Sequence, residues 1–413
     1  MADQLPILDL KRTYADIKDE IQEAVSRVFE SQAFILGQEV RTFEEHVESY
    51  LERGTITGRS SGMDSQGTGS RAVGCPQGDP SGSHSLRSRA VGCASGTDAL
   101  ILALMALDVG PGDEVVTTPY SFFATASCIV RVGATPVFAD IDPVTYNIDL
   151  EKTAAKFGPK TKAFLPVHLF GQTVPLETIA DLCRERGVSI VEDAAQAFGS
   201  WRRVGDEIVR AGTLGDVGAY SFFPTKNLGA CGDAGMIVTA DEKIEERLRR
   251  LRVHGAGTTY FHDEVGLNSR LDALQAAILD VKFRYLETWN AERRVIADCY
   301  RMFFTMRKLE ECVTLPTELE DNFHIYHQYV VRAPRRDELT ARLEERGFST
   351  RVYYPLPLHL QRCFAFLGYG PGDFPESERL SEEALALPIF NGLLPEEQEK
   401  LVDAVAEFYG KRF

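Results

Sequence analysis

Short apolar runs that alternate with helical patterns between residues 90 and 240 place the strongest limit on what this chain can fold into. Four of the runs are rich in Val, Ile and Phe and have the length of buried strands. These runs cover 112–118, 135–140, 162–167 and 188–193. The helical patterns beside them cover 97–108, 122–131 and 176–187. Strand and helix in alternation predict an α/β fold with a mainly parallel sheet and helices on both faces.

Charged helical patterns follow this region and lead into the C-terminal part of the chain. They cover 241–252 and 270–310. Because the second is long, we expect it to link two domains. A strand candidate and a helix come next, at 326–333 and 336–347. We therefore predict a large α/β domain over residues 1–252, and a linker helix with a smaller α+β domain over residues 253–413.

Residues 54–88 do not fit the pattern. They are dominated by Gly, Ser, Asp, Gln and Arg, and such a stretch cannot bury enough apolar surface to offset its chain entropy. The run SRAVGC at 70–75 is repeated at 88–93, and the second copy leads into the Ser95 turn described below. We expect a mobile or disordered insertion. A local duplication, or translated sequence that is not normally coding, explains it as well as a function does.

The charge balance and the cysteines limit the possible partners. The chain of 413 residues has 61 Asp and Glu against 45 Lys and Arg, which argues against nucleic acid as a partner because phosphate binding needs a local basic excess. No apolar run reaches the roughly 18–20 residues of a membrane span, and the start lacks the layout of a secretory signal. The eight cysteines include no C-x-x-C pair and no Cys/His cluster at metal-ligand spacing. We expect free thiols, no metal site and a cytoplasmic location.

The turn Ser95-Gly96-Thr97 opens an apolar helical stretch. A polar turn with a glycine at a helix start exposes unpaired backbone N–H groups at the positive end of the helix dipole. Such a turn suits a phosphate group. The alternative is a plain N-cap, in which a hydroxyl side chain caps a core helix.

Asp193 ends a predicted buried strand, and Gln196 follows it. Ligands of open parallel sheets bind beyond the carboxyl ends of the strands, which places both side chains where chemistry is expected. A carboxylate at this position can be an ordinary helix cap. It is also the group that pyridoxal 5′-phosphate (PLP) needs beside its ring nitrogen, so that the protonated ring acts as an electron sink.

Lys226 lies between an aromatic run and a Gly-rich turn, after a strand. Most lysines are solvated at the surface. A partly desolvated lysine has a lowered pKa and can become the neutral amine that forms a Schiff base.

The three segments occur in the order phosphate turn, carboxylate, lysine, with about 30 residues between Asp193 and Lys226. In this order the chain resembles the fold-type-I PLP enzymes, which are aspartate-aminotransferase-like. It is more similar still to the sugar-nucleotide aminotransferases of the DegT/StrS family. The similar phrases are GCASGTDAL, TPYSFFATA, GATPVFADIDPVTYNID, VEDAAQAFGS, YSFFPTKNLG, GDAGMI, VGLNSRLDALQAAIL and YYPLPLHLQ. With the opening LPILDLKRTY, the resemblance covers nearly all of the chain except 54–88.

The resemblance implies a seven-stranded type of sheet, a small α+β C-terminal domain and a PLP site. Lys226 would attach PLP covalently and carry the proton between the cofactor's C4′ and the substrate carbon. Asp193 would pair with the pyridinium nitrogen, and Gln196 would hydrogen-bond the ring's O3′. Phe122 would stack on the ring, which fixes its plane without competing for its polar edge.

The resemblance also implies how the phosphate is held and how subunits assemble. Gly96, Thr97 and Ser221 would hold the phosphate. Asn268 matches an asparagine that the family supplies from the neighbouring subunit, so the resemblance implies a homodimer with shared active sites.

Arg270 and His359 would face the substrate. The planar fork of Arg270 suits the carboxylate of glutamate or of a uronic-acid sugar. The alternative for each residue is a structural salt bridge or a buried side chain with its own partners. Dehydratase-like members of the family have a histidine in place of the lysine, so the presence of Lys226 favours transamination.

The implied activity moves an amino group from L-glutamate, through the pyridoxamine phosphate form of the cofactor, to a 3- or 4-keto sugar carried by a nucleotide. The phrases GLNSRLDALQAAIL and YYPLPLHLQ most resemble enzymes that aminate a UDP-linked 3-keto uronic acid. Two alternatives stay open: a PLP transaminase of a non-nucleotide cyclic ketone, and an inactive homologue with a binding or regulatory role.

Overall fold

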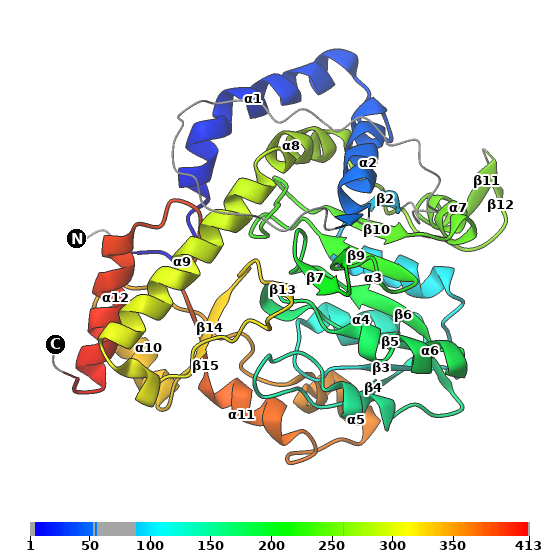
Figure 1. The fold of residues 1–413 in the computed structure, drawn as a ribbon. Helices are drawn as coiled ribbons and strands as arrows, with labels where there is room; N and C mark the ends of the chain where they lie inside the picture. Colours follow the sequence, from blue (N-terminus) through cyan, green and yellow to red (C-terminus); the bar gives the residue numbers. More distant parts are fainter. Residues whose placement is uncertain (1–4, 53, 56–87, 259, 412–413) are drawn as a thin grey trace.

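The computed structural model describes residues 5–52, 54–55, 88–258 and 260–411 (Figure 1). Its helices are α1 (Leu10–Ser31), α2 (Gln38–Leu51), α3 (Gly96–Ala106), α4 (Phe123–Arg131), α5 (Leu150–Ala154), α6 (Ala180–Arg186), α7 (Glu242–Leu251), α8 (Ala273–Phe283), α9 (Leu286–Met306), α10 (Arg336–Glu345), α11 (Pro375–Glu383) and α12 (Pro395–Phe408). Its strands are β1 (Gly54–Thr55), β2 (Arg89–Cys93), β3 (Glu114–Thr117), β4 (Thr135–Phe138), β5 (Thr161–Leu165), β6 (Ser189–Asp193), β7 (Trp201–Val204), β8 (Glu207–Arg210), β9 (Val217–Ser221), β10 (Gly235–Thr239), β11 (Ala256–Thr258), β12 (Phe261–His262), β13 (Asn322–Phe323), β14 (Tyr329–Arg332) and β15 (Ala384–Leu387).

A seven-stranded sheet in the order β2-β10-β9-β6-β5-β3-β4 forms the centre of the molecule. β10 is antiparallel to both of its neighbours, and the pairs from β9 to β4 are parallel. Neighbouring residues of one strand enter different core clusters: Val115 packs on one face and Val116 on the other. Because both faces are covered, apolar side chains on both sides of the strands are buried. The predicted α/β fold with a mainly parallel sheet is confirmed.

The four predicted central strands are β3, β4, β5 and β6, each within a few residues of its expected range. The prediction of one long helix over 270–310 was wrong, because α8 ends at Phe283 and α9 begins at Leu286. The two helices serve different cores: α8 packs on α1 and α2, whereas α9 packs on α12, as Figure 1 shows. The chain therefore changes direction between them.

Most of the insertion at 54–88 lies outside the described residues. Of its described ends, Gly54–Thr55 pairs with β8 as β1, which corrects the expectation of disorder at that point. β2 begins at Arg89 and pairs in full register with β10, so the strand that leads to Ser95 is in place. Its outer edge is closed by α2, because the backbone N–H of Ala90 donates to Glu48 and that of Gly92 donates to Glu44.

The C-terminal part consists of the two-stranded sheet β14-β15, with α10, α11 and α12 around it. The predicted strand 326–333 is shorter than expected, because Tyr326 has a positive φ of 44° and β14 begins only at Tyr329. Cores are shared across the predicted domain division, since α8 packs with α1 and α2. The division between residues 252 and 253 stays a prediction.

The cysteines that the structure describes are all free, and Cys93, Cys128 and Cys183 are buried in the cores. Cys75 lies outside the described residues. Among the described residues, no helix is long and apolar enough to cross a bilayer.

Candidate active site

A cavity of about 500 Å³ lies at the edge of the sheet where the parallel strands end. β6 ends at Asp193 and β9 ends at Ser221, and both residues line the cavity. The cavity brings together seven of the predicted site residues. These are Gly96, Thr97, Phe122, Asp193, Gln196, Ser221 and Lys226.

Lys226 lies in the turn after β9, where its backbone N–H donates to the carbonyl of Phe223. Burial lowers the pKa of the Lys226 amine to about 8, although the negative charge of Asp193 acts in the opposite direction. Near neutral pH a useful fraction of this amine is uncharged. Lys226 therefore has the property that a covalent bond to an aldehyde requires.

Asp193 is 5% exposed, and burial raises the pKa of its carboxyl group. Its Oδ2 accepts a hydrogen bond from Thr125 Oγ1 at 2.8 Å, and its Oδ1 accepts one from the Ala195 amide at 3.2 Å. Thr125 Oγ1 is itself 2.8 Å from Ser121 Oγ. The carboxylate is thus fixed in position and can accept a hydrogen bond from a protonated ring nitrogen.

Sequence reasoning did not identify Thr125. The two hydroxyl residues Ser121 and Thr125 stand in the phrase TPYSFFATA, on either side of the start of α4.

Glu192, the residue before Asp193, anchors the end of β6 from the opposite face. Its carboxylate accepts hydrogen bonds from the backbone N–H groups of Gly212, Leu214 and Gly215 and contacts His168 Nε2 at 2.7 Å. Burial alone would raise the pKa of Glu192, but these partners lower it overall. The strand end that carries Asp193 is therefore held by a buried ionised group.

The turn predicted to be a phosphate cradle lies at the start of α3. Ser95 caps the helix, because its Oγ accepts from the Asp98 N–H at 3.1 Å. The amides of Gly96 and Thr97 belong to the first turn, where a helix leaves N–H groups without intrahelical partners, and both residues line the cavity. A Cβ on residue 96 would lie 2.5 Å from Ser221 Cβ, so only glycine lets the helix start approach the end of β9 this closely. The plain N-cap is present in this turn, and the phosphate site stays a prediction.

Gln196 is held at the cavity wall by two hydrogen bonds. Its Oε1 accepts from the Phe170 N–H at 2.7 Å, and its Nε2 donates to Tyr354 Oη at 3.0 Å. Tyr353 and Tyr354 both line the cavity, and sequence reasoning missed them. They open the phrase YYPLPLHLQ, which drew attention to His359 instead.

Asn268, Arg270 and His359 do not line the cavity of their own chain. Asn268 is exposed and Arg270 is half-buried. His359 is buried, and its Nε2 lies 3.1 Å from Glu378 Oε1, which corresponds to the structural alternative. The substrate roles of Arg270 and His359, and the shared role of Asn268, stay predictions.

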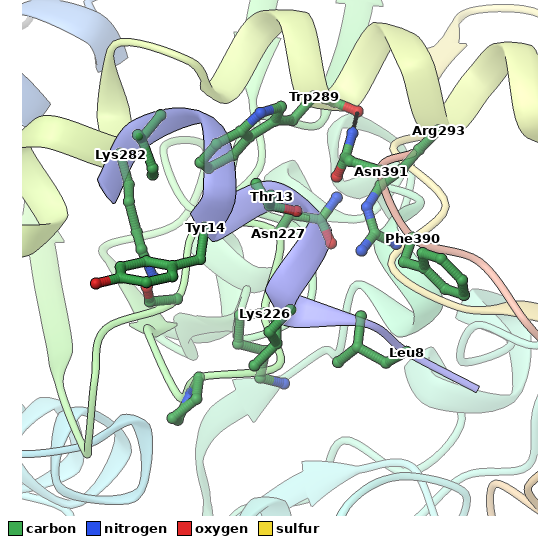
Figure 2. Close-up of a pocket in the computed structure, with 14 residues that line it drawn as sticks. Leu8, Thr13, Tyr14, Lys226, Asn227, Lys282, Trp289, Arg293, Phe390 and Asn391 are labelled. Atoms are coloured by element: carbon green, nitrogen blue, oxygen red, sulfur yellow. Dashed lines mark hydrogen bonds between the residues drawn. The ribbon is translucent and has the colours of Figure 1, made fainter. Parts of the chain in front are cut away.

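The loop that carries Lys226 is fixed from behind through Asn227 (Figure 2). Asn227 Nδ2 donates to Asn290 Oδ1 at 2.8 Å and to the Ile325 carbonyl at 3.2 Å. Figure 2 shows Thr13, from α1, and Arg293, from α9, beside Asn227. These three residues line a smaller cavity of about 50 Å³, which Lys226 also lines. The lysine therefore stands on a loop held by buried hydrogen bonds.

These residues fit PLP. Lys226 supplies an amine with a lowered pKa, and Asp193 supplies a buried carboxylate. The start of α3 supplies first-turn amides beside Gly96, where a Cβ would clash with Ser221. Bound PLP supplies the aldehyde and the ring that withdraws electrons from the substrate carbon. The fold and the site define a PLP-dependent transaminase of fold type I, and the resemblance stated from the sequence is confirmed in fold, cofactor and enzyme class.

Comparison with known proteins identifies the family. Residues 84–406 match the DegT/DnrJ/EryC1/StrS aminotransferase family, and the chain belongs to this family. It is 46% identical to the pleiotropic regulatory protein of Geobacillus stearothermophilus, over 98% of both chains. It is 37% identical to UDP-N-acetyl-3-dehydro-alpha-D-glucosamine 3-aminotransferase of Acidithiobacillus ferrooxidans, over 97% of this chain and 96% of the relative. The crystal structure of S. venezuelae DesV in complex with a ketimine intermediate matches with a TM-score of 0.86 and 34% identity, over all of both chains.

Proposed function

We propose that the chain transfers an amino group from L-glutamate to a nucleotide-linked keto sugar, with a UDP-linked 3-keto sugar as the preferred substrate. The observation that carries the proposal is the cavity that joins Lys226, Asp193 and the α3 cradle. The name of the Acidithiobacillus relative supports a UDP-linked 3-keto sugar. A uronic acid is the preferred form of that sugar if Arg270 meets its carboxylate.

The residues of the chain divide the work of the reaction. Lys226, once its amine is released, holds or delivers the proton at the substrate carbon, which its lowered pKa permits near neutral pH. Asp193 retains a proton at the ring nitrogen of the cofactor. The first-turn amides of α3 orient the phosphate.

We further propose a cytoplasmic homodimer in which Asn268 and Arg270 serve the neighbouring subunit's site. Both residues lie outside the cavity of their own chain. The segment just before them contains β11 and β12. It carries three exposed apolar side chains, Tyr260, Phe261 and Val265, with exposed fractions of 91%, 72% and 89%. Apolar side chains exposed together are typical of an interface.

The visible absorption spectrum with added PLP tests the cofactor and the donor together. We expect a band from bound PLP that L-glutamate bleaches and that Lys226→Ala lacks. Return of the band should then require a keto-sugar nucleotide, and UDP- and dTDP-linked sugars are compared with a cyclic ketone that has no nucleotide. Recovery with the free cyclic ketone alone would favour the non-nucleotide alternative. Absence of the band in folded protein would favour a binding or regulatory role.

Arg270→Ala tests the uronic-acid preference. If Arg270 meets a sugar carboxylate, the variant should lose most of its kcat/KM for the uronic substrate and little for the matched sugar without a carboxylate. Steady-state kinetics on the two sugars check this. Equal kcat/KM values for wild type and variant on the uronic substrate would remove the preference.

A further inference from the structure

His327 lines the active-site cavity together with Lys226, and the function proposed above assigns it no role. It lies two residues before β14, and its side chain is 7% exposed. A histidine in such a place can be a donor, an acceptor or a charged group, depending on where its protons are.

The surroundings of Asn227 determine which ring nitrogen of His327 carries a proton. Asn227 Nδ2 donates to the Ile325 carbonyl and to Asn290 Oδ1, which fixes the orientation of the amide. Its Oδ1 consequently faces His327 Nδ1, at 3.0 Å. An amide oxygen only accepts hydrogen bonds, so Nδ1 must carry the proton and donate.

The charges around the ring keep it neutral. Burial, together with the nearby cations Lys226 and Arg293, lowers the pKa of His327 well below its usual value. Arg293 is held close, because its Nη1 donates to the carbonyls of Tyr326 and His327. With Nδ1 protonated and the ring neutral, Nε2 has a lone pair and no proton. Nε2 has no hydrogen-bond partner among the described residues.

We propose that His327 Nε2 accepts a hydrogen bond from a hydroxyl group of the sugar ring bound in the cavity, and so positions the sugar against Lys226. The proposal rests on the sugar-aminotransferase function proposed above. It follows from an unpaired acceptor in a cavity wall, which is satisfied by a donor from the ligand. It also makes His327 a determinant of specificity, because a lone pair attracts a hydroxyl and repels a carboxylate at the same place.

Two substitutions separate the two nitrogens. His327→Asn can keep a donor near Nδ1 for Asn227 while removing the group at Nε2. His327→Gln can keep an acceptor near Nε2. We expect His327→Asn to raise KM for the sugar nucleotide about tenfold or more, with a smaller change in kcat, and His327→Gln to recover most of that loss.

KM for L-glutamate and the visible band of bound PLP should be the same in wild type and both variants. A purely structural role would instead disturb the PLP band and both substrates together. Unchanged KM for the sugar in folded His327→Asn, or an equal rise for glutamate and sugar, would overturn the proposal.

Nitrogen-15 NMR of the histidine rings tests the geometry without any assay of activity. With His327→Asn used to assign the signal, we expect a protonated Nδ1 and an unprotonated Nε2 at pH 7, and a shift of the Nε2 signal when the sugar nucleotide is added. A proton on Nε2, or a charged ring, would overturn the proposal whatever the activity. If the ring has the expected protonation but the protein has no transaminase activity, the proposed function has failed. The assignment of protons to the two ring nitrogens would still hold.

Discussion

At Lys226, burial and charge act in opposite directions on one amine. Desolvation lowers its pKa to about 8, and the carboxylate of Asp193 limits the fall. The neutral amine is therefore the minor form at pH 7 and the major form above about pH 8. Lys226 was recognised from a local phrase of the sequence, but its balance of charge and burial depends on residues from several elements.

We predict that the apo protein captures PLP faster as the pH rises from 6 to 9, with a midpoint near the pKa of about 8. The rate of appearance of the visible band after mixing measures this. In Asp193→Asn the opposing negative charge is absent, so the midpoint should move to lower pH. A midpoint near the ordinary lysine value would show that Lys226 is solvated.

The Gly96 position leads to a prediction about the phosphate. Gly96→Ala would place a methyl group 2.5 Å from Ser221 Cβ, so the start of α3 must move. Overpacking of this kind costs about 1–3 kcal/mol, and we expect PLP affinity to fall by tenfold or more. Binding of pyridoxal, which has no phosphate, should change little. Gly158→Ala is the matched control, because its Cβ would meet nothing within 4 Å.

At the scale of elements, α2 closes the open edge of the central sheet with carboxylates. Glu44 is 3% exposed, accepts from the Gly92 N–H and binds Arg252 Nη1 at 2.7 Å. The same carboxylate binds Arg249 Nη1 at 2.9 Å. One side chain therefore joins α2, β2 and the end of α7.

Glu44→Ala should lower the free energy of unfolding by about 3–5 kcal/mol, because removal of the carboxylate leaves the buried Arg252 guanidinium without its counter-charge. Urea unfolding followed by circular dichroism measures this. Glu45→Ala changes the next residue, which is exposed, and should cost little. Similar losses in both variants would mean that the buried ion pair does not control the effect.

The sequence predicted the elements of the sheet better than the walls of the site. Strands such as 188–193 are rich in Val and Ile, and Asp193 is the last residue of that strand. Tyr354 and His327 come from distant segments, and only the folded chain brings them to Gln196 and Lys226. For His359 the phrase was recognised, but the side chain is turned into the protein toward Glu378.

At the scale of the whole molecule, the cavity lacks Asn268, which the family resemblance assigns to a second subunit. Asn268 is on the surface of its own chain, near the exposed side chains of the 260–265 segment. A monomer would then have an incomplete site.

We predict that two inactive variants restore activity when they are mixed. In a heterodimer of Lys226→Ala with Asn268→Ala, one site receives its lysine from one chain and its asparagine from the other. Refolding the two together should recover about a quarter of the wild-type activity, because half of the dimers are mixed and each has one intact site. Recovery should be absent if Asn268 serves its own chain.

The position of β2 at the edge of the sheet has a consequence for how this chain tolerates change in length. β1 pairs with β8 at the edge of a separate small sheet, and β2 is the outermost strand of the central one, so both strands are edge strands. We expect changes of length between Thr55 and Ser88 to leave the register of β2 with β10 unchanged, and with it the positions of Ser95 and Gly96. The same junction is therefore a suitable point at which to graft a tag or a reporter domain without altering the chemistry a few residues away.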